Sequence, residues 1–138
     1  MKKSFFRFLF AAAVLLMNSC INDDAPNFHF VPLQIVSADL PEFFSLNQTY
    51  QIRVTYNKPD ACTSFSGFDV TPKDVTIRNV VVIGTKRTDQ ETCDETQTEG
   101  VATFGFEVQH FQTYVFRFWQ GENANGEQQY FEVEVPVI

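Results

Sequence analysis

The chain has little of what catalytic and metal-binding sites are built from. Its 138 residues include two His and three Cys, and no CxxC, GxSxG, HExxH or glycine-rich phosphate-binding motif occurs. Basic residues are also few, because ten Lys and Arg stand against 17 Asp and Glu, for a net charge of −7. Nucleic acids and anionic lipid headgroups attract basic surfaces. We therefore expect a protein that is not an enzyme, has no cofactor and does not bind nucleic acid.

A helical pattern is missing as well, since no stretch repeats its apolar residues with a period of 3.6. What the chain has instead is aromatic residues, 15% of the total, of which 16 are Phe, and aromatic residues favour strands. Apolar and polar residues alternate with a period of two in several segments separated by polar turns such as residues 57–60. The predicted strands cover residues 28–36, 50–56, 65–70, 75–83, 102–108, 114–119 and 131–137.

About seven short strands in roughly 110 residues predict an all-β fold, an antiparallel two-layer sandwich. The polar, acidic stretch from Thr85 to Gly100 is expected to be a long connection. This pattern resembles the immunoglobulin-like modules of bacterial surface lipoproteins, and the resemblance covers residues 28–138. It implies that Tyr114, which opens the penultimate strand, is either a tyrosine corner or a plain core residue. An eight-stranded, lipocalin-like barrel is the alternative fold.

The first 19 residues are typical of an export signal. Lys2, Lys3 and Arg7 precede a run of ten apolar residues, Phe8 to Met17. As a helix this run is about 15 Å long, too short for a bilayer core of about 30 Å. A basic start, a short apolar run and small residues before a break indicate a cleaved signal peptide. We expect residues 1–19 to be removed.

Cys20 adds a membrane anchor to this prediction. Residues 16–20 (LMNSC) resemble the signal-peptide box of bacterial lipoproteins, in which the cysteine after the cleavage site is lipidated. Met and Asn stand where that box usually has Leu and a small residue. The resemblance implies acyl chains, palmitate among them, on Cys20 and an outer-membrane location, since several chains anchor durably. An ordinary cleaved signal with an incidental cysteine is the alternative.

The residues after Cys20 bear on which side of the membrane the protein faces. Asn22-Asp23-Asp24 resembles the acidic tag with which some Gram-negative bacteria send lipoproteins to the cell surface. The resemblance implies a surface-exposed domain, residues 28–138, on a tether formed by residues 20–27. Residence on the periplasmic face, with a merely solvated tether, is the alternative.

Cys62 and Cys93 remain as an even pair once Cys20 carries lipid. In an oxidising compartment such a pair predicts a disulfide, and only one connectivity is available. The bridge would close a loop of 31 residues and contribute roughly 3.5 kcal/mol in the chain-entropy model. A redox or metal-binding role for the two thiols is the alternative interpretation.

Carboxylates are concentrated around Cys93. Asp89, Glu91, Asp94 and Glu95 lie within seven residues, with Glu99 nearby. Ca²⁺ takes six to eight oxygen ligands, and an acidic loop held by a disulfide would position several of them. The spacing and central glycine of an EF-hand are absent. The loop is therefore either a solvated acidic segment or a Ca²⁺ site.

Trp119, with Phe111 and Tyr130 expected beside it near the end of the last hairpin, is the candidate binding residue. On an outer face it would stack on a sugar or anchor a protein partner. On an inner face it would seal the core, and the alternation does not decide between the faces.

Two functional hypotheses follow. The first is a lipid-anchored, non-catalytic binding or structural module of the cell envelope, whose partner is a protein or a glycan. The second is an accessory lipoprotein of an envelope uptake complex, which binds Ca²⁺ or a small ligand.

Overall fold

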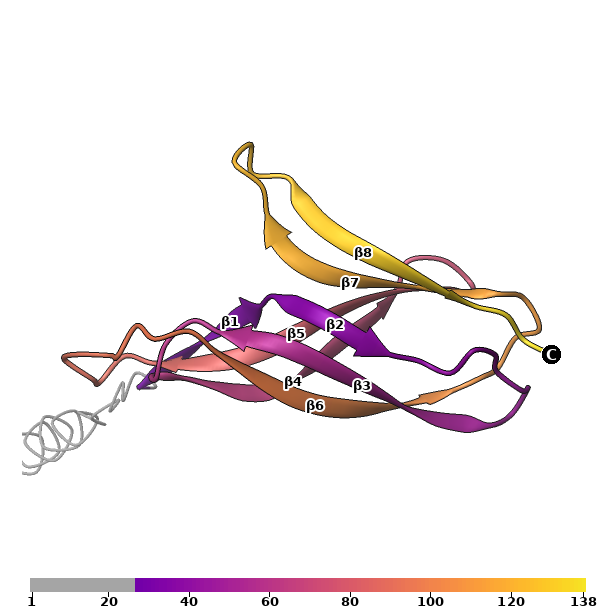
Figure 1. Ribbon diagram of the computed structural model, residues 1–138, viewed down its shortest axis with the longest axis horizontal. Helices are drawn as coiled ribbons and strands as arrows, with labels where there is room; N and C mark the ends of the chain where they lie inside the picture. The colour runs from indigo at the N-terminus through magenta and orange to yellow at the C-terminus, as the bar shows by residue number, and fades with distance from the viewer. Residues whose placement is uncertain (1–26) are drawn as a thin grey trace, which may run out of the picture.

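The computed structural model describes residues 27–138, which contain eight strands (Figure 1). The signal peptide, Cys20 and residues 21–26 of the tether lie outside the described residues. No helix long and apolar enough for a membrane span occurs in the described part. The strands are β1 (Phe28–Leu33), β2 (Ile35–Asp39), β3 (Thr49–Lys58), β4 (Thr63–Pro72), β5 (Ile77–Arg87), β6 (Thr98–Glu107), β7 (Tyr114–Glu122) and β8 (Gln128–Val135).

The strands form two sheets. One sheet contains β1, β4, β5, β7 and β8, and the other has the order β2-β3-β6. The predicted all-β, two-layer sandwich is confirmed, and two separate sheets form rather than one closed sheet. One strand pair differs from the expected antiparallel arrangement, because β5 and β7 are parallel. Strand β6 lies between them in sequence but in the other sheet, so the chain reverses direction twice before it returns to β5.

The first extended segment is divided between the sheets, which raises the strand count to eight. β1 pairs with β5 as far as Leu33, whereas β2 begins at Ile35 and pairs with β3. Gln34 is therefore the residue at which the chain crosses from one sheet to the other. The predicted connection from Thr85 to Gly100 is also shorter, since β5 extends to Arg87 and β6 starts at Thr98. Backbone pairing continues into these polar residues because it needs no apolar side chains.

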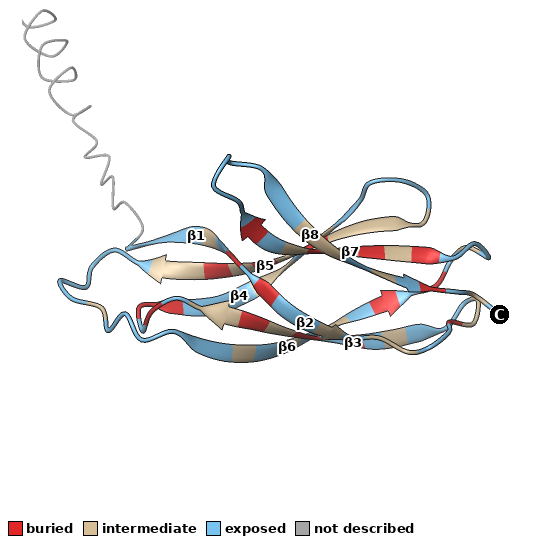
Figure 2. Ribbon diagram, turned by 45° about the horizontal axis from the view of Figure 1, so that its top comes forward, coloured by how far each residue is buried: buried red, intermediate tan, exposed pale blue. Residues whose placement is uncertain are grey.

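The core between the sheets combines aromatic rings with Leu, Ile and Val side chains, and Figure 2 marks the buried residues in red along the strands. Tyr114, Phe116 and Phe118 alternate along β7 and are fully buried. Phe44, from the connection between β2 and β3, is also fully buried. Its ring centroid lies 4.8–6.0 Å from the rings of Tyr50, Phe106, Tyr114 and Phe116. Phe44 was not among the predicted strand residues, because the pattern around it has no period.

Tyr114 makes the contacts of a tyrosine corner. Its hydroxyl oxygen accepts hydrogen bonds from the backbone N–H groups of Gln109 (3.2 Å) and His110 (3.1 Å). These residues lie just upstream of the strand that Tyr114 opens, as in immunoglobulin-like domains. The hydroxyl therefore holds the turn before β7 against the core.

Candidate functional site

Trp119, Tyr130 and Phe111, which were predicted to lie together near the last hairpin, occupy two separate regions of the domain. Trp119 and Tyr130 are cross-strand neighbours on β7 and β8. Phe111 lies in the connection that precedes β7, so the prediction that it joins them at the hairpin end is wrong. Phe111 lies three positions before Tyr114, the first residue of β7, whereas Trp119 lies in the second half of that strand.

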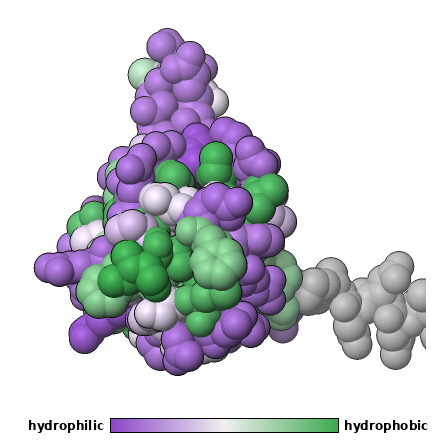
Figure 3. All heavy atoms as spheres, turned by 90° about the vertical axis from the view of Figure 1, so that its right-hand side faces the viewer, coloured by the Kyte–Doolittle hydropathy of each residue, from purple (hydrophilic) through white to green (hydrophobic). Residues whose placement is uncertain are grey.

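Phe111 belongs to an apolar end of the sandwich. Hydrogen bonds join the connection around Phe44 to Pro136 and Ile138, and Asn47 to Val108. Phe43, Phe111 and Ile138 are exposed on these segments. Figure 3 views this end and shows apolar side chains gathered within a polar rim.

Trp119 lies on the outer face of its sheet. Because Tyr114, Phe116 and Phe118 point into the core, the alternating residues Val115, Arg117 and Trp119 point away from it. The indole is partly exposed, and its Nε1 donates a hydrogen bond to Oε1 of Gln128 on β8 at 2.6 Å. The alternation of apolar residues left the position of Trp119 open. The structure places it on the outer face of the sheet and not in the core.

A cleft adjoins Trp119 because two strands share one edge of β5. β1 occupies this edge as far as the pair Leu33–Val82, and β7 occupies it up to the pair Val80–Phe118. Trp119 is thus the first residue of β7 beyond the β5 pairing. At the same level β1 ends and the chain leaves for the other sheet through Gln34. Beyond this point β7 and β8 continue as a two-stranded ribbon that stands away from the other strands (Figure 1).

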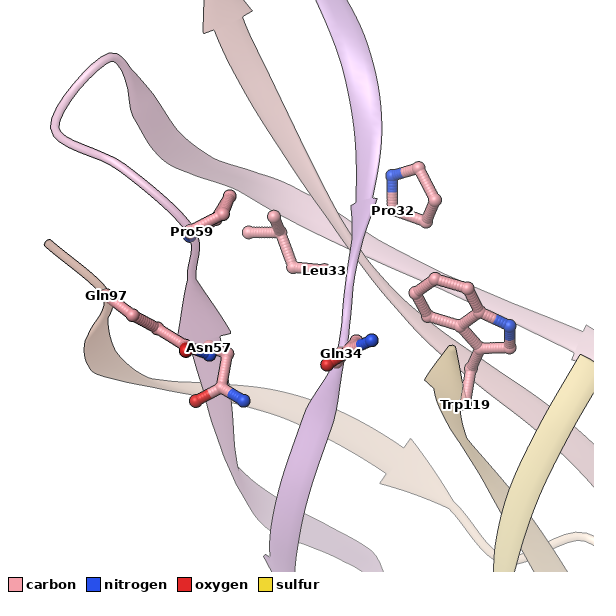
Figure 4. Close-up of a pocket in the computed structure, with 7 residues that line it drawn as sticks. All are labelled: Pro32, Leu33, Gln34, Asn57, Pro59, Gln97 and Trp119. Carbon is pink, nitrogen blue, oxygen red and sulfur yellow. The ribbon is translucent and has the colours of Figure 1, made fainter. Parts of the chain in front are cut away.

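The cleft has a volume of about 240 Å³. The chain passes through its middle at Gln34, where it crosses between the sheets. Figure 4 shows Trp119 and Pro32 on one side of this crossing. The other side is formed by residues from β1, the end of β3 and the segment before β6: Leu33, Asn57, Pro59 and Gln97. None of the seven lining residues carries a charge, an acid, a base or a nucleophile.

Gln34 is held in place from two directions. Its carbonyl oxygen accepts a hydrogen bond from the backbone N–H of Asn57 at 2.9 Å. Its side chain lies directly against Gly121, which is buried and has φ of +111°. A side chain at residue 121 would be strained by this φ and would collide with the Gln34 amide. Glycine therefore suits position 121, where another residue would strain the backbone and displace the Gln34 amide that lines the cleft.

Most of the residues that line the cleft carry no recognisable signal in the sequence. Trp119 was the candidate, and residues 57–60 were recognised only as a turn. Pro32, Gln34 and Gln97 have no motif of their own, since each lies at the end of a strand or between two strands. These segments are brought together by the pairing of β1 and β7 with the same edge of β5, and by the pairing of β3 with β2 and β6 in the other sheet.

The disulfide lies between the β3–β4 turn and the acidic connection. Cys62 and Cys93 are bridged, with a Cα–Cα distance of 5.6 Å, so the predicted disulfide is confirmed. Asp89 and Asp94 are engaged locally: Arg87 donates two hydrogen bonds to Asp89 (2.9 and 2.6 Å), and Thr96 donates two to Asp94. These bonds hold the pKa of each carboxyl below its usual range.

The four carboxylates proposed for Ca²⁺ are not brought together. Asp89, Glu91, Asp94 and Glu95 are all exposed. Among the described residues, the one group of three His, Cys, Asp or Glu whose ligand atoms lie within 4.8 Å of one another is Asp60, Cys62 and Cys93. Both sulfur atoms of that group are in the disulfide, so it offers a single carboxylate and does not form a metal site.

Asp60 instead stabilises the start of β4. It is 6% exposed, and its carboxylate accepts hydrogen bonds from Lys86 Nζ (2.8 Å), Thr63 Oγ1 (2.8 Å) and the Cys62 backbone N–H (3.0 Å). The hydrogen bond from Lys86, followed by that from Thr63, lowers the pKa of Asp60. A lowered folded-state pKa means that ionised Asp60 contributes stability above its unfolded pKa of about 3.9, and that this contribution is lost as the pH falls through the folded value.

We expect Asp60→Asn to lower the free energy of unfolding at pH 7 by roughly 1–2 kcal/mol, because the charged hydrogen bond to Lys86 is lost. The difference in unfolding free energy between the wild type and the variant should narrow below about pH 4, where Asp60 of the unfolded chain begins to protonate while the folded carboxyl, with its lowered pKa, is still ionised. Urea unfolding between pH 2 and 7 measures this gap. Asp89→Asn is the control, since its pair with Arg87 lies on the surface and should matter little at any pH. A constant gap across the pH range would contradict the role of ionised Asp60.

In comparisons with protein families, curated proteins and solved structures, the chain matches none of them.

Proposed function

We propose that this protein is a lipid-anchored, non-catalytic binding module of the bacterial cell envelope. Its N-terminal sequence supports the anchor, since a basic start, a short apolar run and Cys20 follow the order of a lipoprotein signal. Fully extended, the seven residues that follow Cys20 in the tether, 21–27, reach about 25 Å. The acidic residues after Cys20 support a position at the cell surface, where the domain meets partners outside the cell.

The observation that carries the binding role is the composition of the Trp119 cleft. Binding sites combine apolar or aromatic walls with a few polar groups that fix the orientation of the ligand. The cleft has Trp119 and two prolines as walls and three amide side chains as polar groups. General acid–base or nucleophilic catalysis needs a titratable or nucleophilic group, and the lining has none. The cleft is therefore suited to holding a molecule and not to transforming it.

We expect Cys20→Ala to move the protein from the membrane fraction to the soluble fraction, because the acyl chains that anchor it would have no attachment point. Immunoblotting of fractionated cells measures the distribution. Protease treatment of intact cells expressing the wild type should remove the domain if the anchor is on the outer face. Ala25→Ser is the control, since it leaves Cys20 and both tether aspartates in place. Membrane association that survives Cys20→Ala would overturn the proposed anchor.

A further inference from the structure

We infer that the Trp119 cleft binds an uncharged saccharide, with one sugar ring stacked on the indole. This inference rests on the proposed function, because it names the class of ligand for the same cleft.

Trp119 is a fixed aromatic platform. Its Nε1 donates to Gln128 across the hairpin, and its cross-strand neighbour is Tyr130. The guanidinium of Arg117 lies 4.4 Å from the centroid of the Tyr130 ring and also donates to Glu132. These contacts order the outer face of the hairpin around the indole before any ligand arrives. A pre-organised ring loses little conformational entropy on binding, and it offers a large apolar face for the C–H groups of a sugar ring.

The polar groups that line the cleft suit hydroxyl groups. Gln34, Asn57 and Gln97 each carry an amide with one carbonyl acceptor and two N–H donors. A sugar hydroxyl both donates and accepts, so an amide can satisfy either side of it. Gln34 lies between Trp119 and Asn57 (Figure 4). A ring stacked on the indole therefore has an amide beside it.

The lack of charge in the lining argues against other small ligands. A phosphate, a carboxylate or a metal ion would lose hydration in the cleft without a counter-charge, and burying an unpaired charge is costly. A wholly apolar ligand would cover the three amides without satisfying them, which is also unfavourable. A proline-rich peptide needs a groove lined by several aromatic residues, whereas this lining has Trp119 alone. An uncharged molecule with an apolar face and many hydroxyls meets all these conditions.

The volume of the cleft sets the size of the bound unit. At about 240 Å³ it is smaller than the roughly 300–1,000 Å³ of sites for drug-sized ligands. One or two sugar rings are therefore in contact, and the rest of a longer glycan extends into solvent. A contact of this size predicts weak binding per site, with a Kd of about 0.1–10 mM.

The single Trp in the sequence makes the test direct, since all indole fluorescence comes from Trp119. The full chain, purified in detergent, is titrated with a panel of uncharged oligosaccharides. Two comparison ligands are a sialylated or sulfated oligosaccharide and a proline-rich decapeptide. We expect a saturable change in emission with at least one uncharged saccharide, and a response at least tenfold weaker to the charged analogue and to the peptide.

Variants then place the ligand in the cleft, with binding followed by saturation-transfer NMR. We expect Trp119→Ala to weaken binding about thirtyfold, as for a central aromatic contact. Gln34→Ala and Asn57→Ala keep the indole and should weaken binding severalfold. Phe111→Ala is the control, because Phe111 is an exposed aromatic residue away from the cleft, and it should leave the Kd unchanged. Circular dichroism confirms that each variant is folded.

Three results would overturn the inference: no saturable response to any uncharged saccharide, tighter binding of the charged saccharide or the peptide, or saccharide binding that survives Trp119→Ala. Peptide or charged-sugar binding lost in Trp119→Ala would overturn the ligand class while leaving the cleft as a binding site. These results do not bear on the proposed lipid anchor, which is tested separately by the membrane fractionation of Cys20→Ala.

Discussion

Replacing Phe44 by alanine is expected to lower the free energy of unfolding by about 3–5 kcal/mol, the largest effect that we predict for a single substitution in this protein. Phe44 is fully buried, and four aromatic rings surround it at centroid distances of 4.8–6.0 Å. The backbone of Phe44 is held on both sides, since its N–H donates to Pro136 and its carbonyl accepts from Ile138. The surrounding segments therefore cannot collapse fully into the space that the ring leaves.

Urea unfolding followed by circular dichroism measures this loss. Phe43→Ala is a matched control, since the adjacent Phe43 is 45% exposed and its removal should cost about 0.5 kcal/mol or less. Equal losses for the two substitutions would contradict the assignment of Phe44 to the core. So would a loss below about 1 kcal/mol for Phe44→Ala.

Removing the disulfide is expected to have the second large effect, a loss of about 3.5 kcal/mol in Cys62→Ala/Cys93→Ala. The bridge spans 31 residues, and without it the unfolded chain gains the freedom of an open loop of that length. For a domain of about 110 residues this corresponds to a drop in Tm of roughly 10–20 °C. Differential scanning calorimetry measures this drop.

The single variants provide the control for the disulfide. Either substitution alone breaks the same bond, so Cys62→Ala and Cys93→Ala should each cost nearly as much as the double variant. The reduced wild type should resemble all three. A double variant whose loss equals the sum of the two single losses would show that the cysteines contribute through packing and not through the bridge.

The cleft at Trp119 arises from the same feature that makes the sandwich irregular. A strand that stayed in one sheet would cover the edge of β5 along its whole length. Here β1 ends at Leu33, the chain crosses to the other sheet, and β7 takes over the edge of β5. The gap between the two strands is where Gln34 and Trp119 meet. Because β1 and β2 belong to different sheets, the edge of β5 is not covered by one continuous strand. The break in this edge creates the concave surface on which the proposed function depends.

Local patterns predicted most of the secondary structure. Period-two alternation marked the strands because each half-buried strand must present one apolar face, which is a property of neighbouring residues alone. The Cys62–Cys93 bridge followed from counting, since only one pair remained once Cys20 was assigned to lipid. The contacts of the Tyr114 hydroxyl favour the tyrosine corner, one of the two roles that the resemblance left open. These features need little knowledge of which strands are partners.

The sequence by itself determined the strands, the all-β class and the disulfide, because each depends on alternation, composition or the number of cysteines. Only the tertiary structure decided the partners of the strands, the parallel pairing of β5 with β7, the burial of Phe44 and the outward face of Trp119. Backbone hydrogen bonds pair strands of any sequence, so alternation says which residues share a face but not where that face points. The cleft is formed by four segments between residues 32 and 119. No local sequence pattern predicts that these segments lie side by side.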